Sequence, residues 1–182
     1  MLVALKKRKE NIVEYILYLY QIEDLIRAFS MDIDLINEKL IPEYKSDRET
    51  SLKISEWYSN LIVMMGKEGK KEKGHLQFLL NLISDLNEFH LKLRVTEADE
   101  IYNSTYREVM NLIFELKEKN PLAGNDIEIA LDGVYGYLIL KIQKKNISTP
   151  TEEAVRRLSH WLGYLAQLYR DFEAGNFEFY SG

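Results

Sequence analysis

Residues 9–30 read KENIVEYILYLYQIEDLIRAFS, and this stretch decides the fold class. Its apolar residues recur at alternating spacings of four and three, as they do along one face of an α-helix. Those residues are Ile12, Ile16, Leu19, Ile22, Ile26 and Phe29. Further apolar side chains lie outside that face, at Tyr15, Leu17, Tyr18, Tyr20 and Leu25. We therefore expect a central helix that contacts neighbours on most of its sides.

Polar side chains within this apolar helix are the candidate site residues. Glu23 and Asp24 precede Arg27 by four and three residues, and both spacings allow ion pairs within a helix. One hypothesis is a structural ion pair that fixes the helix register, which is the more common role of such clusters. The alternative is a polar ligand pocket beside this helix. Its candidate residues are Glu14, Tyr18, Gln21, Glu23, Asp24, Arg27 and, from another helix, His90.

The remaining chain shows the same helical periodicity and no sustained alternation of the kind that predicts strands. Apolar stripes cover residues 33–40, 54–64, 76–93, 102–116, 127–142 and 155–172. The connections between them are short, which favours antiparallel packing of consecutive helices. The sequence predicts an all-α fold, an antiparallel helical bundle of six or seven helices. It forms a single domain over residues 1–175, followed by a C-terminal tail at 176–182.

Several helix ends can be predicted from local signals. Capping boxes at Ser46–Glu49 and at Thr149–Glu152 predict two helix starts, and Asn125 with Glu128 predicts a third. Gly175 and the pair Asn120–Pro121 are suitable helix stops.

The amino-acid composition excludes some classes of function but does not identify the function. The 182 residues contain no cysteine, which excludes disulfides, thiol catalysis and thiolate metal ligands and fits a reducing, cytoplasmic location. The net charge of −5 argues against nucleic acid as a partner, and the basic residues between Lys67 and Lys73 resemble a solvated loop. The longest purely apolar run, residues 134–140, is too short for a membrane span.

No arrangement of catalytic or metal-binding residues is evident. A di-iron helical bundle needs two Glu-x-x-His motifs, and the one from Glu72 to His75 has no second copy. His75, His90 and His160 lie on separate segments, and a histidine at an apolar helix position is usually a hydrogen-bonded core residue. We therefore assign no catalytic residue, no metal and no cofactor.

Two features suggest close contacts. Ala130, Gly133 and Gly136 are small residues spaced three apart in one predicted helix, where each glycine costs about 1 kcal/mol relative to alanine. Packing against a neighbouring helix would offset that cost, as would a bound ligand, and we favour helix packing. In the tail, Phe177, Phe179 and Tyr180 dock on their own bundle or on a second subunit, or the tail is disordered.

Two stretches carry a resemblance to a known family. They are KENIVEYILYLYQIEDLIRA at residues 9–28 and LDGVYGYLILKIQKKNIS at residues 131–148. Together they resemble a bacterial family of all-helical cytoplasmic proteins classified only as a domain of unknown function, over nearly the whole chain. The resemblance implies a helical fold and brings no activity, cofactor or catalytic residue.

The sequence thus favours an uncharacterised, non-catalytic helical bundle that acts through protein–protein contacts, with a homo-oligomer or a protein partner. The alternative is a small-molecule-binding module with a polar pocket beside the helix at residues 9–30.

Overall fold

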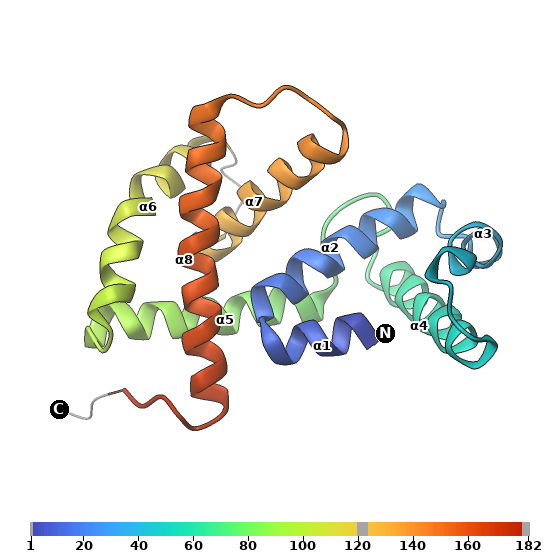
Figure 1. Cartoon of the computed structure of the whole chain (residues 1–182), viewed down its shortest axis with the longest axis horizontal. Helices are drawn as coiled ribbons and strands as arrows, with labels where there is room; N and C mark the ends of the chain where they lie inside the picture. Colours follow the sequence, from blue (N-terminus) through green and yellow to red (C-terminus); the bar gives the residue numbers. More distant parts are fainter. Residues whose placement is uncertain (1, 120–123, 180–182) are drawn as a thin grey trace. The chain divides into compact units, whose positions relative to one another are not determined.

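The computed structural model describes residues 2–119 and 124–179, and these residues form α-helices, one 3-10 helix and connecting segments, with no strand (Figure 1). This confirms the all-α fold class. In chain order the helices are α1 (Leu2–Glu10), α2 (Ile12–Ala28), α3 (Ile33–Lys39), the 3-10 helix η1 (Ile41–Tyr44), α4 (Arg48–Lys67), α5 (Gln77–Thr96), α6 (Glu100–Lys119), α7 (Asp126–Ile142) and α8 (Thr149–Glu173).

Helix α1 is an element that the periodicity does not reveal. Its sequence, LVALKKRKE, ends in a run of charged residues and has no apolar stripe, so no pattern distinguishes it from a loop. Asn11 separates it from α2, the helix predicted over residues 9–30. The described residues therefore contain eight α-helices, against the six or seven predicted.

Two predicted capping boxes are shifted by one residue. The side chain of Asp47, not Ser46, caps α4 by accepting from the Thr50 amide at 2.9 Å. Ser148, not Thr149, caps α8 by accepting from the Thr151 amide. A neighbouring side chain with the same acceptor chemistry takes the position in each case.

Of the other predicted helix ends, two agree with the structure and one lies outside the described residues. The third predicted start is correct, because Asn125 accepts from the Glu128 amide and caps α7. Gly175, with a φ of +74°, ends α8 in the left-handed conformation that glycine adopts readily. The predicted stop at Asn120–Pro121 lies outside the described residues.

The chain divides into two compact units. The N-terminal unit comprises Met1–Arg8 and Glu14–Asn81, and in it α3, η1 and α4 contact one another. Its core contains side chains with no exposed surface. They are Ile16, Tyr20, Ile26, Ile36, Tyr58, Met65, Leu76 and Leu79. The single domain predicted over residues 1–175 stays a prediction.

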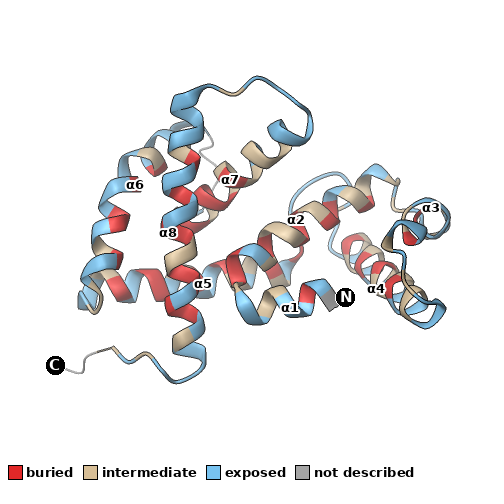
Figure 2. Cartoon of the chain, in the orientation of Figure 1, coloured by how far each residue is buried: buried red, intermediate tan, exposed pale blue. Residues whose placement is uncertain are grey.

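The C-terminal unit comprises Lys9–Val13 and Leu82–Gly182, and in it α6, α7 and α8 each contact the other two. The buried positions of α8 follow the predicted stripe, with Leu158, Leu162 and Leu165 almost without exposed surface (Figure 2). Trp161 is also completely buried. These three helices enclose the cleft described below.

Aromatic residues of the tail pack onto the C-terminal unit. The rings of Phe177 and Phe179 lie 6.0 and 5.4 Å from that of Phe89 on α5, and Phe179 also contacts Phe172 on α8. The described part of the tail therefore docks on its own chain, which is one of the three predicted alternatives. Tyr180 lies outside the described residues.

Candidate functional site

The predicted cluster on α2 is built around Glu23, a carboxylate with 1% of its surface exposed. Its Oε1 accepts a hydrogen bond of 2.8 Å from the backbone amide of Leu76, and its Oε2 lies 2.6 Å from Nδ1 of His75. The His75 ring stacks on Tyr20, with 3.5 Å between the ring centroids. Burying a carboxylate is costly unless its oxygens are paired, and here both oxygens of Glu23 have partners.

Arg27 binds the segment that connects α4 to α5, the same segment that contains the partners of Glu23. Its guanidinium pairs with Asp24 at 2.7 Å and donates to the backbone carbonyls of Lys70 and Gly74. Glu23 and Arg27 therefore each bind the connection between α4 and α5, and the ion pair of Arg27 is with Asp24. This geometry fits the structural hypothesis for the cluster and extends it, because the same residues anchor a loop.

The remaining predicted residues lie in different surroundings. Glu14 is exposed and pairs with Lys7 at 2.7 Å. Gln21 is half-buried on α2, and Tyr18 lines a cleft of the N-terminal unit. His90 belongs to the C-terminal unit.

His90 is a buried core histidine there. A hydrogen bond of 2.6 Å joins its Nδ1 to the Tyr102 hydroxyl, and its ring lies 4.8 Å from Tyr106 and 5.5 Å from Trp161. Burial lowers the pKa of His90 from 6.5 to about 4, against the opposing influence of Asp126. The side chain is therefore neutral at pH 7 and is a constituent of the core.

The cleft of the N-terminal unit, of about 350 Å³, is where Tyr18 lies. Tyr18, Tyr44, Ser46, Thr50 and Lys53 supply its polar groups, and Val3 and Ile54 are apolar. The hydroxyls of Tyr44 and Tyr58 are 2.7 Å apart. Burial, together with Tyr44, raises the pKa of Tyr18 to about 12, so this phenol is neutral at pH 7.

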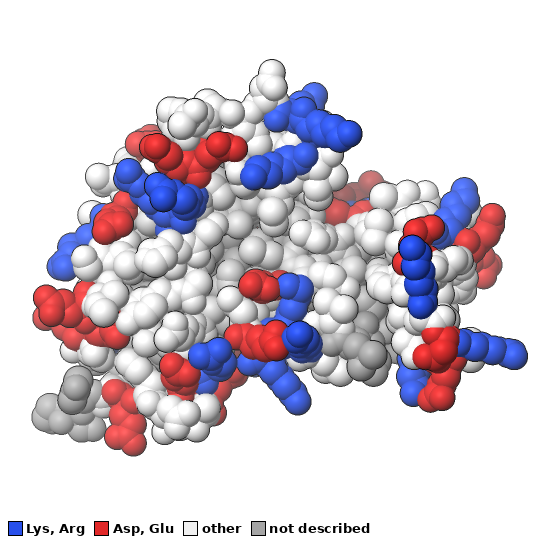
Figure 3. All heavy atoms as spheres, in the orientation of Figure 1, with Lys and Arg blue, Asp and Glu red and all other residues white. Residues whose placement is uncertain are grey.

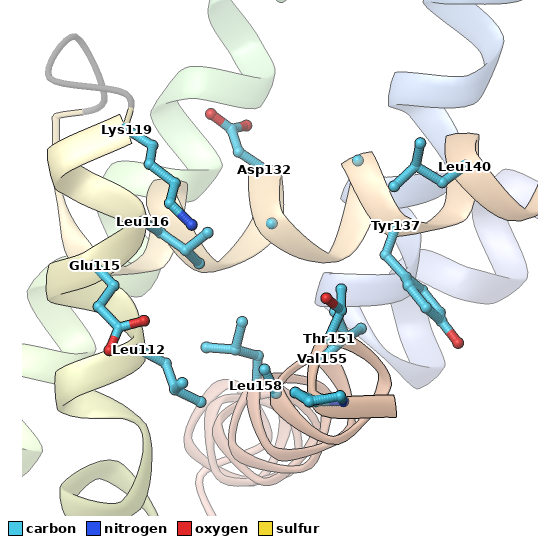
Figure 4. A pocket seen from close by; sticks show the side chains of 14 residues that line it. Leu112, Glu115, Leu116, Lys119, Asp132, Tyr137, Leu140, Thr151, Val155 and Leu158 are labelled. Carbon is cyan, nitrogen blue, oxygen red and sulfur yellow. The ribbon is translucent and has the colours of Figure 1, made fainter. Parts of the chain in front are cut away.

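A larger cleft of about 510 Å³ lies between α6, α7 and α8 (Figure 4). That volume falls within the usual range for small-molecule sites. Most of its lining is apolar, and its large apolar side chains are Leu112, Leu116, Leu140, Val155 and Leu158. Glu115, Lys119, Asp132, Tyr137 and Thr151 supply its polar groups. An apolar surface with a few polar groups around it is typical of a ligand site.

The two glycines of α7 contribute differently to this cleft. A Cβ on Gly133 would come within 2.9 Å of Leu116 Cδ1 and 3.6 Å of Leu158 Cδ1, so Gly133 allows close approach of α6 and α8. This agrees with the predicted helix packing. A Cβ on Gly136 would meet no atom within 4 Å, so helix packing does not explain this glycine, which borders the open cleft.

Some polar groups of the cleft interact with neighbouring side chains and others do not. The Tyr137 hydroxyl donates to Glu152 on α8 at 3.4 Å, and Lys141 lies over the Tyr137 ring. Figure 4 shows Glu115 and Lys119 extending from α6 toward the space between the three helices. Within residues 2–119 and 124–179, neither of these two side chains forms a hydrogen bond or an ion pair.

The polar groups of the cleft lining are two carboxylates, one ammonium group, one phenol and one threonine hydroxyl. Its lining contains no histidine and no serine, and its carboxylates border an apolar surface. Across the described part of the chain, no group of three or more His, Asp or Glu side chains could hold a metal ion. On the face shown in Figure 3, side chains of both charge signs are intermixed on each unit. None of the described helices is both long and apolar enough to cross a membrane.

Residues 1–176 match the family model described as Domain of unknown function (DUF4924). The chain belongs to this family. The DUF4924 match spans α1 to α8 and so includes every residue that lines the cleft. No curated protein and no solved structure matches the chain.

Sequence reasoning did not identify the cleft residues of this DUF4924 chain. Leu112, Glu115 and Lys119 follow an ordinary amphipathic pattern, and nothing in their spacing sets them apart. The spacing of Gly133 and Gly136 was the available signal, since it marks the α7 wall. His75 was also missed as the partner of Glu23, because 52 residues separate them.

Proposed function

We propose that this protein is a non-catalytic binding module and that the cleft between α6, α7 and α8 holds a small amphipathic molecule. The observation that carries the proposal is Gly136, a helix-interior glycine beside a cleft of about 510 Å³ with no neighbouring atom that would exclude a side chain. Glycine there costs about 1 kcal/mol of helix stability relative to alanine. Keeping the cleft open for a ligand is a reason to retain it.

Apolar residues on the cleft floor support the same function. Val155 and Leu158 are buried, whereas Leu140 at the edge is 39% exposed. A ligand that covered Leu140 and its neighbours would remove apolar surface from water, at about 25 cal/mol for each Å² covered. The small-molecule alternative predicted from the sequence thus has its best site here, and the predicted pocket beside α2 stays a prediction.

Native mass spectrometry of gently purified protein tests this function. We expect a small added mass that is lost on unfolding. We also expect a Gly136→Leu variant, whose side chain would project into the cleft, to lose this mass while keeping its fold. Gly163→Leu on α8 is the matched control, because Gly163 also has no neighbour within 4 Å and does not line the cleft. Equal added mass in both variants would exclude the cleft as the site.

Protein–protein contact, including self-association, is the second candidate function. The observation that favours it is an exposed apolar pair on α6, Met110 and Phe114, with 46% and 63% of their surfaces exposed. Residues four apart lie on the same side of a helix, so the two side chains form one apolar patch. The same mass spectra test this function, since Met110→Lys with Phe114→Lys would convert an assembly to a monomer.

Three further properties are part of this proposal. An antiparallel arrangement of the helices, a cytoplasmic location and a bacterial origin are proposed from the sequence and from the resemblance. The absence of cysteine supports a reducing compartment.

A further inference from the structure

The cleft between α6, α7 and α8 carries one charge of each sign at its edge. Glu115 and Lys119 lie four residues apart on α6, one helical turn along the same side. A Glu followed four residues later by a Lys favours a direct ion pair. Neither side chain has a partner within residues 2–119 and 124–179, so both are available to a ligand.

These charges border an apolar surface. Leu112 and Leu116, on α6 itself, line the cleft beside them, and Leu158 of α8 faces them across it (Figure 4). A ligand complementary to this surface has an apolar body and a head that carries both charges. Its ammonium group would meet Glu115, and its anionic group would meet Lys119.

We infer that the cleft takes a small zwitterionic amphiphile, a molecule with an ammonium group, a carboxylate and an apolar chain. This inference rests on the proposed ligand-binding function and names the chemical class of its ligand. A molecule with a single charge would satisfy one side chain and leave the other without a partner, so it would bind less tightly.

Four probes with the same chain length test the inference by titration calorimetry: 2-aminooctanoic acid, octylamine, octanoic acid and octanol. We expect 2-aminooctanoic acid to bind most tightly. Glu115→Gln should weaken 2-aminooctanoic acid and octylamine about fivefold, which corresponds to a partly exposed ion pair, and leave octanoic acid no weaker. Lys119→Met should weaken 2-aminooctanoic acid and octanoic acid by a similar factor. Neither variant should affect octanol.

Matched controls are available on the same helix. Glu118→Gln and Lys117→Met change the same charges at positions that do not line the cleft, and they should leave all four affinities unchanged. Far-UV circular dichroism and urea unfolding midpoints establish that each variant keeps its fold.

The outcomes separate the inference from the function on which it rests. Equal affinity for the four probes, or no effect of Glu115→Gln and Lys119→Met, would overturn the zwitterionic class and leave a binding cleft. Binding of none of the four would overturn both. Binding to vesicles of phosphatidylcholine without binding to 2-aminooctanoic acid would replace the free small molecule by a lipid surface and would also overturn the inference.

Discussion

At the scale of single residues, Glu23 shows how a polar side chain within an apolar helix is accommodated. The sequence marks Glu23 as unusual, but its partners, the His75 ring and the Leu76 amide, lie more than 50 residues along the chain. Helical spacing identifies neighbours within one helix and gives no information about such distant partners. The sequence therefore predicted that a polar cluster exists, and the fold determines which groups complete it.

Substitution of Glu23 should destabilise the protein far more than substitution of its neighbour Asp24. Glu23→Ala would leave the buried Leu76 amide and the His75 ring without an acceptor, and we expect a loss of about 3 kcal/mol of unfolding free energy. Asp24→Ala removes a pair whose carboxylate is 47% exposed, and should cost less than about 1 kcal/mol. Urea unfolding measures both, and equal losses would contradict the role assigned to Glu23.

His90 should make the protein sensitive to acid. Its pKa falls from 6.5 in the unfolded chain to about 4 in the fold, so below pH 6.5 the unfolded state binds more protons than the folded state. Stability is therefore lost as pH falls from 6.5 toward 4, with a slope of up to about 1.4 kcal/mol for each pH unit.

The measurement is the unfolding free energy from urea titrations across that pH range. His90→Gln should flatten the slope while His160→Gln, at an exposed position, should not change it. An unchanged slope in His90→Gln would show that the acid sensitivity arises from other groups.

At the scale of helices, periodicity located α2 to α8 because each has a continuous apolar stripe, and it missed α1 because that helix has none. Capping residues were predicted to within one position, since adjacent serines, threonines and aspartates compete for the same amide. The cleft could not be predicted from any single helix, because its walls come from three helices and depend on how these pack.

Substitution of the two glycines of α7 by alanine should change the stability of the protein to different extents. Gly136→Ala should stabilise the protein by about 0.5–1 kcal/mol, because the helix gains propensity and the new Cβ meets open space. Gly133→Ala should give a smaller gain, because its Cβ would come within 2.9 Å of Leu116 Cδ1 and the Leu116 side chain would have to move. Thermal unfolding of the two variants is the test, and an equal gain at both positions would show that Gly133 is not needed for the packing of α6.

At the scale of the whole molecule, three of the described helices continue across the boundary between the compact units. Helix α5 extends from Gln77 in the N-terminal unit to Thr96 in the C-terminal unit. Helix α1 crosses the boundary between residues 8 and 9, and α2 crosses it between residues 13 and 14. Helix formation is cooperative along a continuous segment, so unfolding of one unit removes support for residues of the other. This continuity favours the single domain that chain length and periodicity predict.

The two tryptophans allow this prediction to be tested, because Trp57 belongs to the N-terminal unit and Trp161 to the C-terminal unit. In a Trp161→Phe variant, fluorescence reports the N-terminal unit, and in a Trp57→Phe variant it reports the C-terminal unit. We expect the fluorescence transition in urea to coincide with the far-UV circular dichroism transition of the same variant, as two-state unfolding requires. Comparison within each variant matters because loss of the buried Trp161 will itself lower stability. A fluorescence transition separated from the circular dichroism transition in either variant would show that the two units unfold independently and would divide residues 1–175 into two domains.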